Sequence, residues 1–220
     1  MSEVTEAQKT KRNIRWTIAF CLLFIVGVVS LVVNKIVSPR VMNADELRLN
    51  GAIMFDMPRR FEPFELVNQN AEAFTQEDFK GHWSLLYFGF THCPDICPTT
   101  MADMSRLVSA LPQDIANNTE VMLISLDPAR DTPELMKQYV TYFGADFTGV
   151  TGDFLTIRRF ANQVNVAFSK VTQGDDYTID HSGNVVLINP RGDYHGFFKP
   201  PFELAKLKAT YSSIYQSFDG

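Results

Sequence analysis

The longest uninterrupted apolar stretch of the chain runs from Trp16 to Val33 and contains no charged side chain. A helix of this length crosses most of the hydrocarbon core of a bilayer, so the pattern predicts a transmembrane helix over 16–33. A cleaved signal peptide is the alternative, but its apolar region is usually shorter, and no small-x-small cleavage pattern follows Val33. Cys21 follows the bulky Phe20 and is interpreted as a small apolar filler of this helix.

Beyond residue 60, short apolar runs alternate with segments of helical periodicity. Runs at 64–67 and 71–74 flank Asn68-Gln-Asn70 and predict a small hairpin. Thr75-Gln-Glu-Asp78 has the form of a helix-capping box. The other predicted elements are strands at 83–88, 121–126, 166–171, 184–189 and 194–198, and helices at 98–110, from 131–134 onward, at 153–163 and at 201–218.

The order of these elements predicts the fold class. The two buried runs, 83–88 and 121–126, are each followed by a helix, which implies parallel pairing of the strands. The later runs 184–189 and 194–198 flank the turn signal Pro190-Arg-Gly192 and predict a β-hairpin. Two βα units, a hairpin and a terminal helix follow the order of a thioredoxin-like fold. We therefore expect an α/β, thioredoxin-like domain over 61–220, preceded by a single N-terminal transmembrane helix.

The segments that flank the apolar span predict how the chain is placed. Residues 34–60 contain Pro39, Gly51 and Pro58 but little periodicity, and we interpret them as a linker. Basic side chains gather before the span, so residues 1–15 are expected to form a cytoplasmic tail; they are Lys9, Lys11, Arg12 and Arg15. The large domain is then expected in the periplasm, on the outer side of a bacterial inner membrane, because the tail lacks the Arg- and Ser-rich character of an organelle transit peptide.

Composition and charge narrow the classes of function. The chain has 220 residues, of which 45% are hydrophobic and 20% are charged, as suits a packed domain with an appendage. The formal net charge is -5, so we expect no basic surface that would bind nucleic acid.

Two of the three cysteines, Cys93 and Cys97, lie between a predicted buried strand and a predicted helix start. Unpaired N–H groups and the positive end of the helix dipole favour thiolate there, so we expect both thiols to ionise more readily than free cysteine. A spacing of four residues places both sulfurs within reach of one soft ion, either Cu(I) or zinc. A redox-active or purely structural disulfide between them is the alternative.

A third ligand would strengthen a two-thiolate site and admit Cu(II), for which imidazole is suited. His82 and His195 are explained more simply as surface or strand residues. His92 adjoins Cys93, and neighbouring side chains of an extended segment point in opposite directions. His181 lies in a predicted loop just before the hairpin, and in a thioredoxin-like fold that loop packs against the cysteine loop.

Three separated motifs together resemble the Sco/SenC family, which assists assembly of the copper centre of cytochrome c oxidase. They are Phe88-Gly-Phe-Thr-His-Cys-Pro-Asp-Ile-Cys-Pro-Thr-Thr100, Asp127-Pro-Ala-Arg-Asp-Thr-Pro-Glu-Leu135 and Tyr177-Thr-Ile-Asp-His-Ser182. The similarity covers roughly 61–215, and a membrane anchor is typical of the family. The resemblance implies that Cys93, Cys97 and His181 are copper ligands.

Other side chains in these motifs have several interpretations. Asp127 and Asp131 could tune the site electrostatically, but a turn residue and a helix cap explain them without function. Asp180 is a candidate for orienting the histidine or for lying beside the metal. Met101 and Met104 are interpreted as core side chains rather than Cu(I) ligands.

Two functions from different classes remain open at this stage. The resemblance implies a membrane-anchored metallochaperone that delivers copper to the copper A centre of cytochrome c oxidase, or prepares the thiols of that centre. Its partners would be the copper A subunit and an upstream copper chaperone or thiol reductant. The alternative is a membrane-tethered thiol-disulfide oxidoreductase with Cys93 and Cys97 as its redox-active pair. A peroxiredoxin is disfavoured, because Leu86 and Phe90 stand where its Pro and Thr should be.

Overall fold

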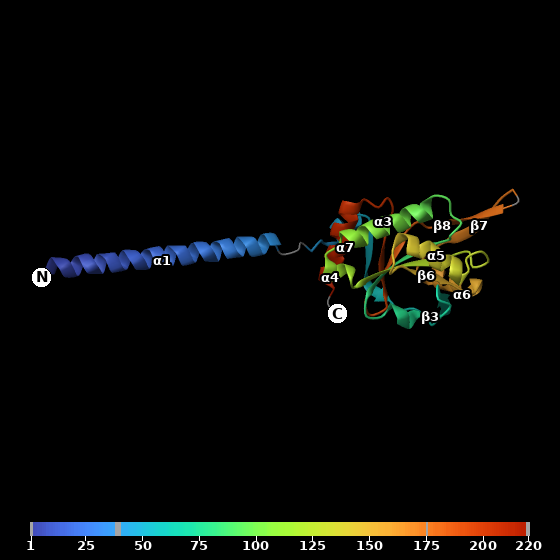
Figure 1. Ribbon diagram of the computed structural model, residues 1–220, viewed down its shortest axis with the longest axis horizontal. Helices are drawn as coiled ribbons and strands as arrows, with labels where there is room; N and C mark the ends of the chain where they lie inside the picture. Colours follow the sequence, from blue (N-terminus) through green and yellow to red (C-terminus); the bar gives the residue numbers. More distant parts are fainter. Residues whose placement is uncertain (1, 38–40, 175, 219–220) are drawn as a thin grey trace. The chain divides into compact units, whose positions relative to one another are not determined.

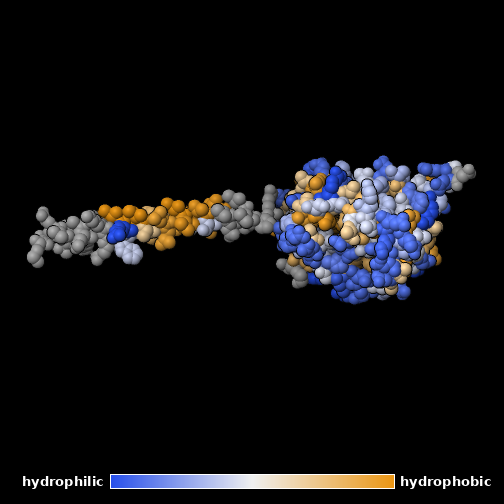
Figure 2. Space-filling model, viewed as in Figure 1, coloured by the Kyte–Doolittle hydropathy of each residue, from blue (hydrophilic) through white to orange (hydrophobic). Residues whose placement is uncertain are grey.

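The computed structural model describes residues 2–37, 41–174 and 176–218, and the chain forms two compact units, 1–40 and 41–220. The first unit contains helix α1 (Ser2–Val37). Its stretch Ile14–Val32 has a mean hydropathy of 2.2 and exposed side chains, and it forms the apolar band in Figure 2. Within the described residues, α1 is the one helix long and apolar enough to cross a membrane, as signal sequences also are.

Part of the first unit lies outside this description. The side chains of residues 1–13 and 33–37 are not described, nor are residues 38–40, which belong to the predicted linker. The orientation that the basic cluster predicts, with residues 1–15 in the cytoplasm, therefore stays a prediction. Cys21 is exposed on α1, as a residue of the apolar band would be.

The linker prediction is wrong for most of its length, because residues 44–59 are structured. Helix α2 (Ala44–Leu49) is capped by Asn43 and followed by strand β1 (Ala52–Arg59). Gly51 joins them with φ +86°, a left-handed conformation that glycine adopts without a steric cost. β1 is an edge strand of the sheet, where a proline such as Pro58 is tolerated. The globular unit therefore begins near residue 41.

The globular unit is built on an eight-stranded mixed sheet of order β1-β10-β9-β4-β5-β6-β2-β3. The strands β4, β5 and β6 pair in parallel, and the remaining neighbours pair antiparallel. The strand bounds besides β1 are β2 (Glu65–Asn68), β3 (Ala73–Thr75), β4 (Trp83–Gly89), β5 (Thr119–Ser125), β6 (Thr148–Thr151), β9 (Val185–Ile188) and β10 (Tyr194–Phe198). Every residue of β4 is buried, which explains its continuous apolar sequence.

Helices cover both faces of this sheet. A Cβ added to Gly89 would meet both Tyr87 and Cys97 of α3, so Tyr87 points toward α3. The next residue, Phe88, points to the opposite face of the sheet and packs on Phe160 of α6, with 5.3 Å between the ring centroids. Helix α3 packs beside α7 and α5 (Figure 1). The helix bounds are η1 (Gln76–Phe79), α3 (Ile96–Ala110), α4 (Gln113–Ala116), α5 (Pro133–Phe143), α6 (Phe154–Gln163) and α7 (Leu204–Ser217).

A second, two-stranded sheet stands apart from the main one. It consists of β7 (Phe168–Gln173) and β8 (Asp176–His181), which pair antiparallel from Phe168↔His181 to Gln173↔Asp176. Only β7 was expected, as a strand over 166–171. β8 replaces the predicted loop around His181, and β6 was also not predicted.

Most other predictions of local structure are confirmed. The β2–β3 and β9–β10 hairpins, the capping box at Thr75 and the helix capped by Asp153 are all present. The helix cap expected at Asp131 is wrong: the side chain of Thr132 caps α5, and Pro133 is its first residue.

Candidate metal centre

The cysteine loop joins the end of β4 to the start of α3. Asp95 occupies the N-cap position of α3 but makes no capping hydrogen bond with its side chain. Instead, the backbone N–H of Cys97 donates to the Cys93 sulfur at 3.4 Å. The sulfur thus takes the place of a capping oxygen, and both cysteines are held on one side of the first helical turn.

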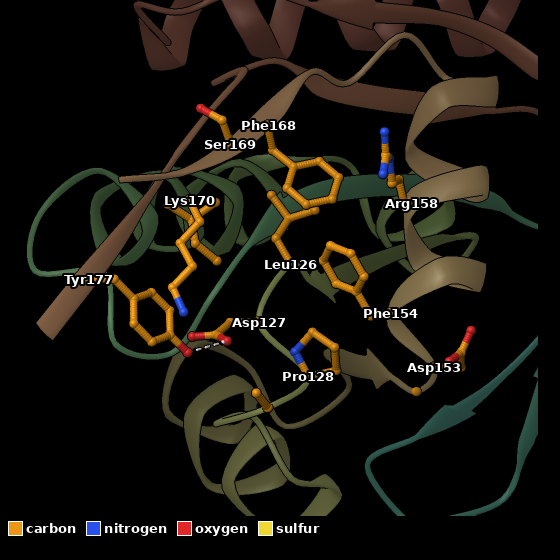
Figure 3. A pocket seen from close by; sticks show the side chains of 13 residues that line it. Leu126, Asp127, Pro128, Asp153, Phe154, Arg158, Phe168, Ser169, Lys170 and Tyr177 are labelled. Carbon is orange, nitrogen blue, oxygen red and sulfur yellow. Dashed lines mark hydrogen bonds between the residues drawn. The ribbon is translucent and has the colours of Figure 1, made fainter. Parts of the chain in front are cut away.

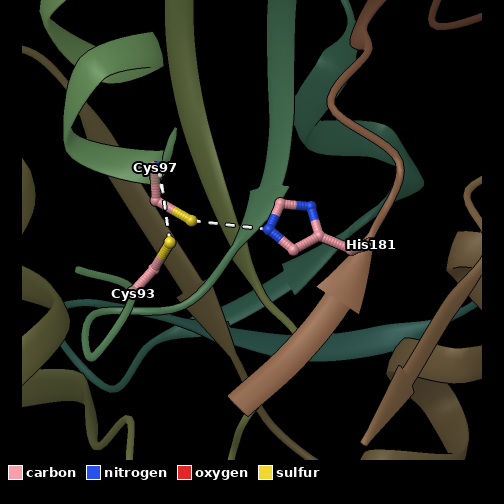
Figure 4. Close-up of side chains that lie close together, drawn as sticks. All are labelled: Cys93, Cys97 and His181. Atoms are coloured by element: carbon pink, nitrogen blue, oxygen red, sulfur yellow. Dashed lines mark hydrogen bonds between the residues drawn. The ribbon is translucent and has the colours of Figure 1, made fainter. Parts of the chain in front are cut away.

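His181 approaches this pair from the end of β8, 84 residues downstream. Its Nε2 lies 3.5 Å from the Cys97 sulfur (Figure 4). Its Nδ1 lies 3.1 Å from the carbonyl oxygen of Ser182. Because a carbonyl only accepts, Nδ1 donates to it, and the lone pair of Nε2 is left pointing at the sulfurs, as is usual for a histidine that binds a metal.

The three side chains form a site that could hold one ion. The two sulfurs and an imidazole nitrogen all lie within 4.8 Å of one another, and this is the only such cluster found among the described residues. Three ligands bonded to one transition-metal ion at about 2.0–2.3 Å in a trigonal arrangement lie about 3.5–4.0 Å apart. A shift of about 1 Å in the longest separation therefore suffices to close this set around an ion.

Aromatic rings fix the imidazole in this position. Tyr87 and Phe90 contact the His181 ring edge to face, with centroids 5.7 Å and 6.1 Å away. Gly89 leaves room for the sulfur, since a Cβ there would lie only 2.9 Å from the Cys97 Sγ. Cys97 is buried, whereas Cys93 and His181 are half-buried, so solvent and partners reach the site at Cys93 and His181.

The two thiols differ in their proton affinity. The pKa of Cys93 is lowered from its ordinary value near 9 to about 4, chiefly by a hydrogen bond from the Cys97 thiol and also by hydrogen bonds from backbone N–H groups. The pKa of Cys97 is raised, because its proton is held by the Cys93 sulfur and because the group is buried. The expectation that both thiols ionise readily is therefore wrong for Cys97.

The structure does not bring the other candidate residues into the cluster. Asp180 precedes His181 on β8 and its side chain is exposed. The backbone carbonyl of Ser182, and not Asp180, contacts the His181 Nδ1 and orients the ring. His82 pairs with Glu120 at 2.9 Å. His92 and His195 are also outside the cluster. The two methionines considered as possible ligands, Met101 and Met104, lie on α3. Both methionines are buried in the core, as predicted.

One residue near the site has a role that the sequence interpretation missed. Asp131 is buried, and its carboxylate accepts the Thr91 hydroxyl at 2.6 Å and the Thr91 N–H at 3.2 Å. Thr91 lies two residues before Cys93, so this carboxylate holds the start of the cysteine loop. Pro133 was the available signal, since a proline at the first helical position assigns the cap to the residue before it.

Comparisons with known proteins agree with this geometry. The SCO1/SenC family model matches residues 56–216. A putative copper-binding protein of Stutzerimonas stutzeri is 39% identical over 165 residues, which cover 74% of this chain and 81% of that protein. The structure of Bradyrhizobium japonicum ScoI with copper bound is 35% identical, with a TM-score of 0.61, and the match covers 71% of this chain and 98% of that one.

A plant structure shows the same similarity. Arabidopsis thaliana ScoI with copper bound is 30% identical, with a TM-score of 0.67, over 70% of this chain and 98% of that one. The resemblance and the thioredoxin-like fold expected from the sequence are both confirmed. The family model spans well over half of the sequence, and the chain therefore belongs to the SCO1/SenC family.

Proposed function

We propose that this protein is a copper-binding metallochaperone in which Cys93, Cys97 and His181 hold one copper ion. The observation that carries the proposal is the convergence of two sulfurs and one imidazole nitrogen within 4.8 Å. Thiolates select Cu(I), and an added imidazole also suits Cu(II). The copper-bound relatives support this choice of metal.

The accessibility of the site fits a protein that passes its metal on. Cys93 is half-buried and its low pKa keeps it ionised, His181 is also half-buried, and only Cys97 is fully buried. An incoming thiolate or imidazole can therefore reach the ion from the Cys93 side and replace the ligands one at a time. A resident structural metal would more usually be enclosed by four protein ligands.

The target is inferred from the family, whose members are described as cytochrome c oxidase assembly proteins. We propose that copper is delivered to the copper A centre of the oxidase, with the copper A subunit as recipient and an upstream copper chaperone or thiol reductant as donor. The apolar helix α1 supports a membrane anchor. The basic residues before it support a cytoplasmic N-terminus and a periplasmic globular unit in a bacterial inner membrane.

A specific observation also supports a second function, that of a thiol-disulfide oxidoreductase. Cys93 combines a pKa of about 4 with partial exposure, as an attacking thiolate requires, and Cys97 lies in position to resolve a mixed disulfide. Copper and a disulfide would compete for the same two sulfurs. In this role the protein would prepare the cysteines of the copper A centre instead of, or in addition to, filling them.

Copper titration of full-length protein in detergent tests the ligand set. We expect reduced, metal-free protein to bind one copper ion, and His181→Ala to weaken Cu(II) binding by more than about tenfold, because even outer partners of a metal ligand contribute that much. Binding of Cu(I) by the two thiolates should change far less. His92→Ala is the matched control, since His92 adjoins Cys93 but lies outside the cluster. Equal Cu(II) affinity in wild type and His181→Ala would overturn the proposal.

A further inference from the structure

The hairpin that carries His181 is weakly attached to the rest of the globular unit. β7 and β8 form their own two-stranded sheet, and of their residues only Ile179 is buried. An isolated pair of strands is marginally stable in water. A cavity of about 620 Å³ further separates the hairpin from the loop after β5 and from the start of α6 (Figure 3). Apolar packing alone therefore does little to fix the middle of the hairpin.

Arg130, in the loop between β5 and α5, bridges this gap. Its guanidinium pairs with Asp127 in its own loop and donates to the hairpin twice, at 3.2 Å to the Asp176 carboxylate and at 3.3 Å to the Tyr177 carbonyl oxygen. The guanidinium carbon also lies 3.8 Å from the centroid of the Tyr177 ring. Only 19% of the Arg130 side chain is exposed, so its contacts with Asp127 and with the Tyr177 carbonyl are largely shielded from water, whereas the Asp176 carboxylate is 78% exposed.

Asp127 makes a second connection to the hairpin. Its carboxylate accepts the Tyr177 hydroxyl at 2.8 Å, as Figure 3 shows. Only 5% of the Asp127 side chain is exposed. A buried carboxylate needs such donors, and hydrogen bonds to charged groups are the stronger kind. Tyr177 is thus fixed at both its hydroxyl and its carbonyl, and it lies on the same face of the hairpin as His181, four residues along β8.

The same loop also holds the cysteines. The backbone N–H of Asp127 donates to the Ser125 hydroxyl at 3.0 Å, and that hydroxyl donates to Asp131 at 2.6 Å. Asp131 in turn accepts both donors of Thr91, at the start of the cysteine loop. A continuous run of hydrogen bonds therefore links the cysteine loop to the histidine hairpin through residues 125–131.

A second path joins Arg130 to the imidazole. Its guanidinium lies 5.9 Å from the centroid of the Phe90 ring, and Phe90 contacts the His181 ring edge to face. Displacing Arg130 would therefore remove support both from the strand that bears His181 and from the ring that its imidazole packs against.

We propose that Asp127 and Arg130 are positioning residues for the metal site, which hold His181 at the distance from the cysteine pair that a three-ligand ion requires. This inference rests on the proposed function. Cu(I) needs only the two thiolates, whereas Cu(II) depends on the imidazole. Loss of Arg130 should therefore weaken the binding of Cu(II) selectively, and it should alter the spectrum of the Cu(II) complex.

The experiment compares Cu(I) and Cu(II) affinities of full-length variants in detergent, together with the Cu(II) electron paramagnetic resonance spectrum. Arg130→Met should lose about tenfold in Cu(II) affinity, within the range known for outer partners of a ligand, and should show weaker nitrogen coupling. Its Cu(I) affinity should stay within about threefold of wild type, since both thiolates remain. The Cu(II) affinity of Arg130→Lys should lie between those of wild type and Arg130→Met, because an ammonium group lacks the planar fork with which arginine donates to several acceptors.

Lys170→Met is the matched control. Lys170 also lies against the Tyr177 ring, 3.3 Å from its centroid, but within the described residues it donates no hydrogen bond to 125–131. Its Cu(II) affinity and spectrum should match wild type. Tyr177→Phe removes only the hydrogen bond to Asp127 and should lose less Cu(II) affinity than Arg130→Met. This variant tests the inference if Arg130→Met fails to fold.

Each outcome separates this inference from the proposed function. If His181→Ala weakens Cu(II) binding while Arg130→Met and Tyr177→Phe behave as wild type, the ligand set stands and the positioning role is refuted. If Arg130→Met weakens Cu(I) and Cu(II) equally, the residue supports general folding, and the inference also fails. If His181→Ala itself has no effect, the proposed ligand set fails first.

Discussion

Unequal ionisation of the two thiols predicts how the metal-free protein reacts with an alkylating reagent. Cys93 has a pKa of about 4, whereas the pKa of Cys97 is raised. A folded-state pKa below the ordinary value means that Cys93 stays ionised as the pH falls from 9 toward 4. Over this range the reduced pair should therefore carry one thiolate and one thiol.

The size of the effect follows from these values. At pH 6 a thiol with a pKa of about 4 is about 99% ionised, whereas a free cysteine with a pKa of about 8.5 is about 0.3% ionised. The alkylation rate of Cys93 should therefore stay within about twofold between pH 6 and pH 8, where the rate of a free thiol rises nearly tenfold per unit. The plateau itself should be modest, because nucleophilicity falls with pKa.

The assay is iodoacetamide labelling of reduced, metal-free protein at several pH values, with each cysteine quantified by peptide mass spectrometry. Cys97→Ala removes the hydrogen bond that lowers the Cys93 pKa most, so in this variant the pH dependence should return toward that of a free thiol. Mass spectrometry also separates Cys21, which lies on α1. A Cys93 rate that rises tenfold per unit through pH 6–8 in wild type would refute the reasoning.

Further variants test the surroundings of the site. Gly89→Ala should weaken copper binding in titrations, because the added Cβ would lie 2.9 Å from Cys97 Sγ. Gly183→Ala is the control and should keep the wild-type copper affinity, because its added Cβ has its nearest neighbour at 3.5 Å. Equal copper affinities of the two variants would contradict this prediction. Thr132→Ala should lower the free energy of unfolding in denaturant by about 1 kcal/mol through loss of a helix cap and leave copper binding unchanged. Asp131→Asn should lower the free energy of unfolding by about 2 kcal/mol and should also lower the copper affinity, because charged hydrogen bonds to the cysteine loop are lost. A wild-type copper affinity in this variant would show that Asp131 does not support the metal site.

Continuous buried apolar runs made the central strands predictable. Burial alone did not decide the outcome, because β6 is buried at three of its four positions and was missed, whereas the exposed β7 was predicted. β4 is buried at every position and β9 likewise, so their apolar runs identify them directly. β1 was missed because its register shifts between Met54 and Arg59, which breaks the alternation that marks an ordinary strand. β8 was missed because it buries only Ile179 and its end around His181 was interpreted as a loop.

The candidate site also combines features that could be predicted from the sequence with features that could not. Cys93 lies in the loop three residues before α3 and Cys97 is the second residue of that helix, so their proximity follows from local geometry. The approach of His181 depends on contacts between distant segments, and it was indicated by the expected thioredoxin-like fold and by the resemblance to a family. The raised pKa of Cys97 was not predictable either, because a helix start favours thiolate at both positions, and burial and the shared proton decide between them.

The segment 125–131 shows why a local explanation of a polar residue can be incomplete. Asp131 and Thr132 are both good cap residues, but Pro133 at the first helical position assigns the cap to Thr132. Asp131 is then a buried carboxylate with no local use, and burial of such a charge is costly unless donors surround it. The donors that it finds belong to Ser125 and to the start of the cysteine loop. A carboxylate displaced from a cap by its neighbour and still buried therefore indicates a long-range contact, and in this chain that contact holds the segment that supplies two of the proposed metal ligands.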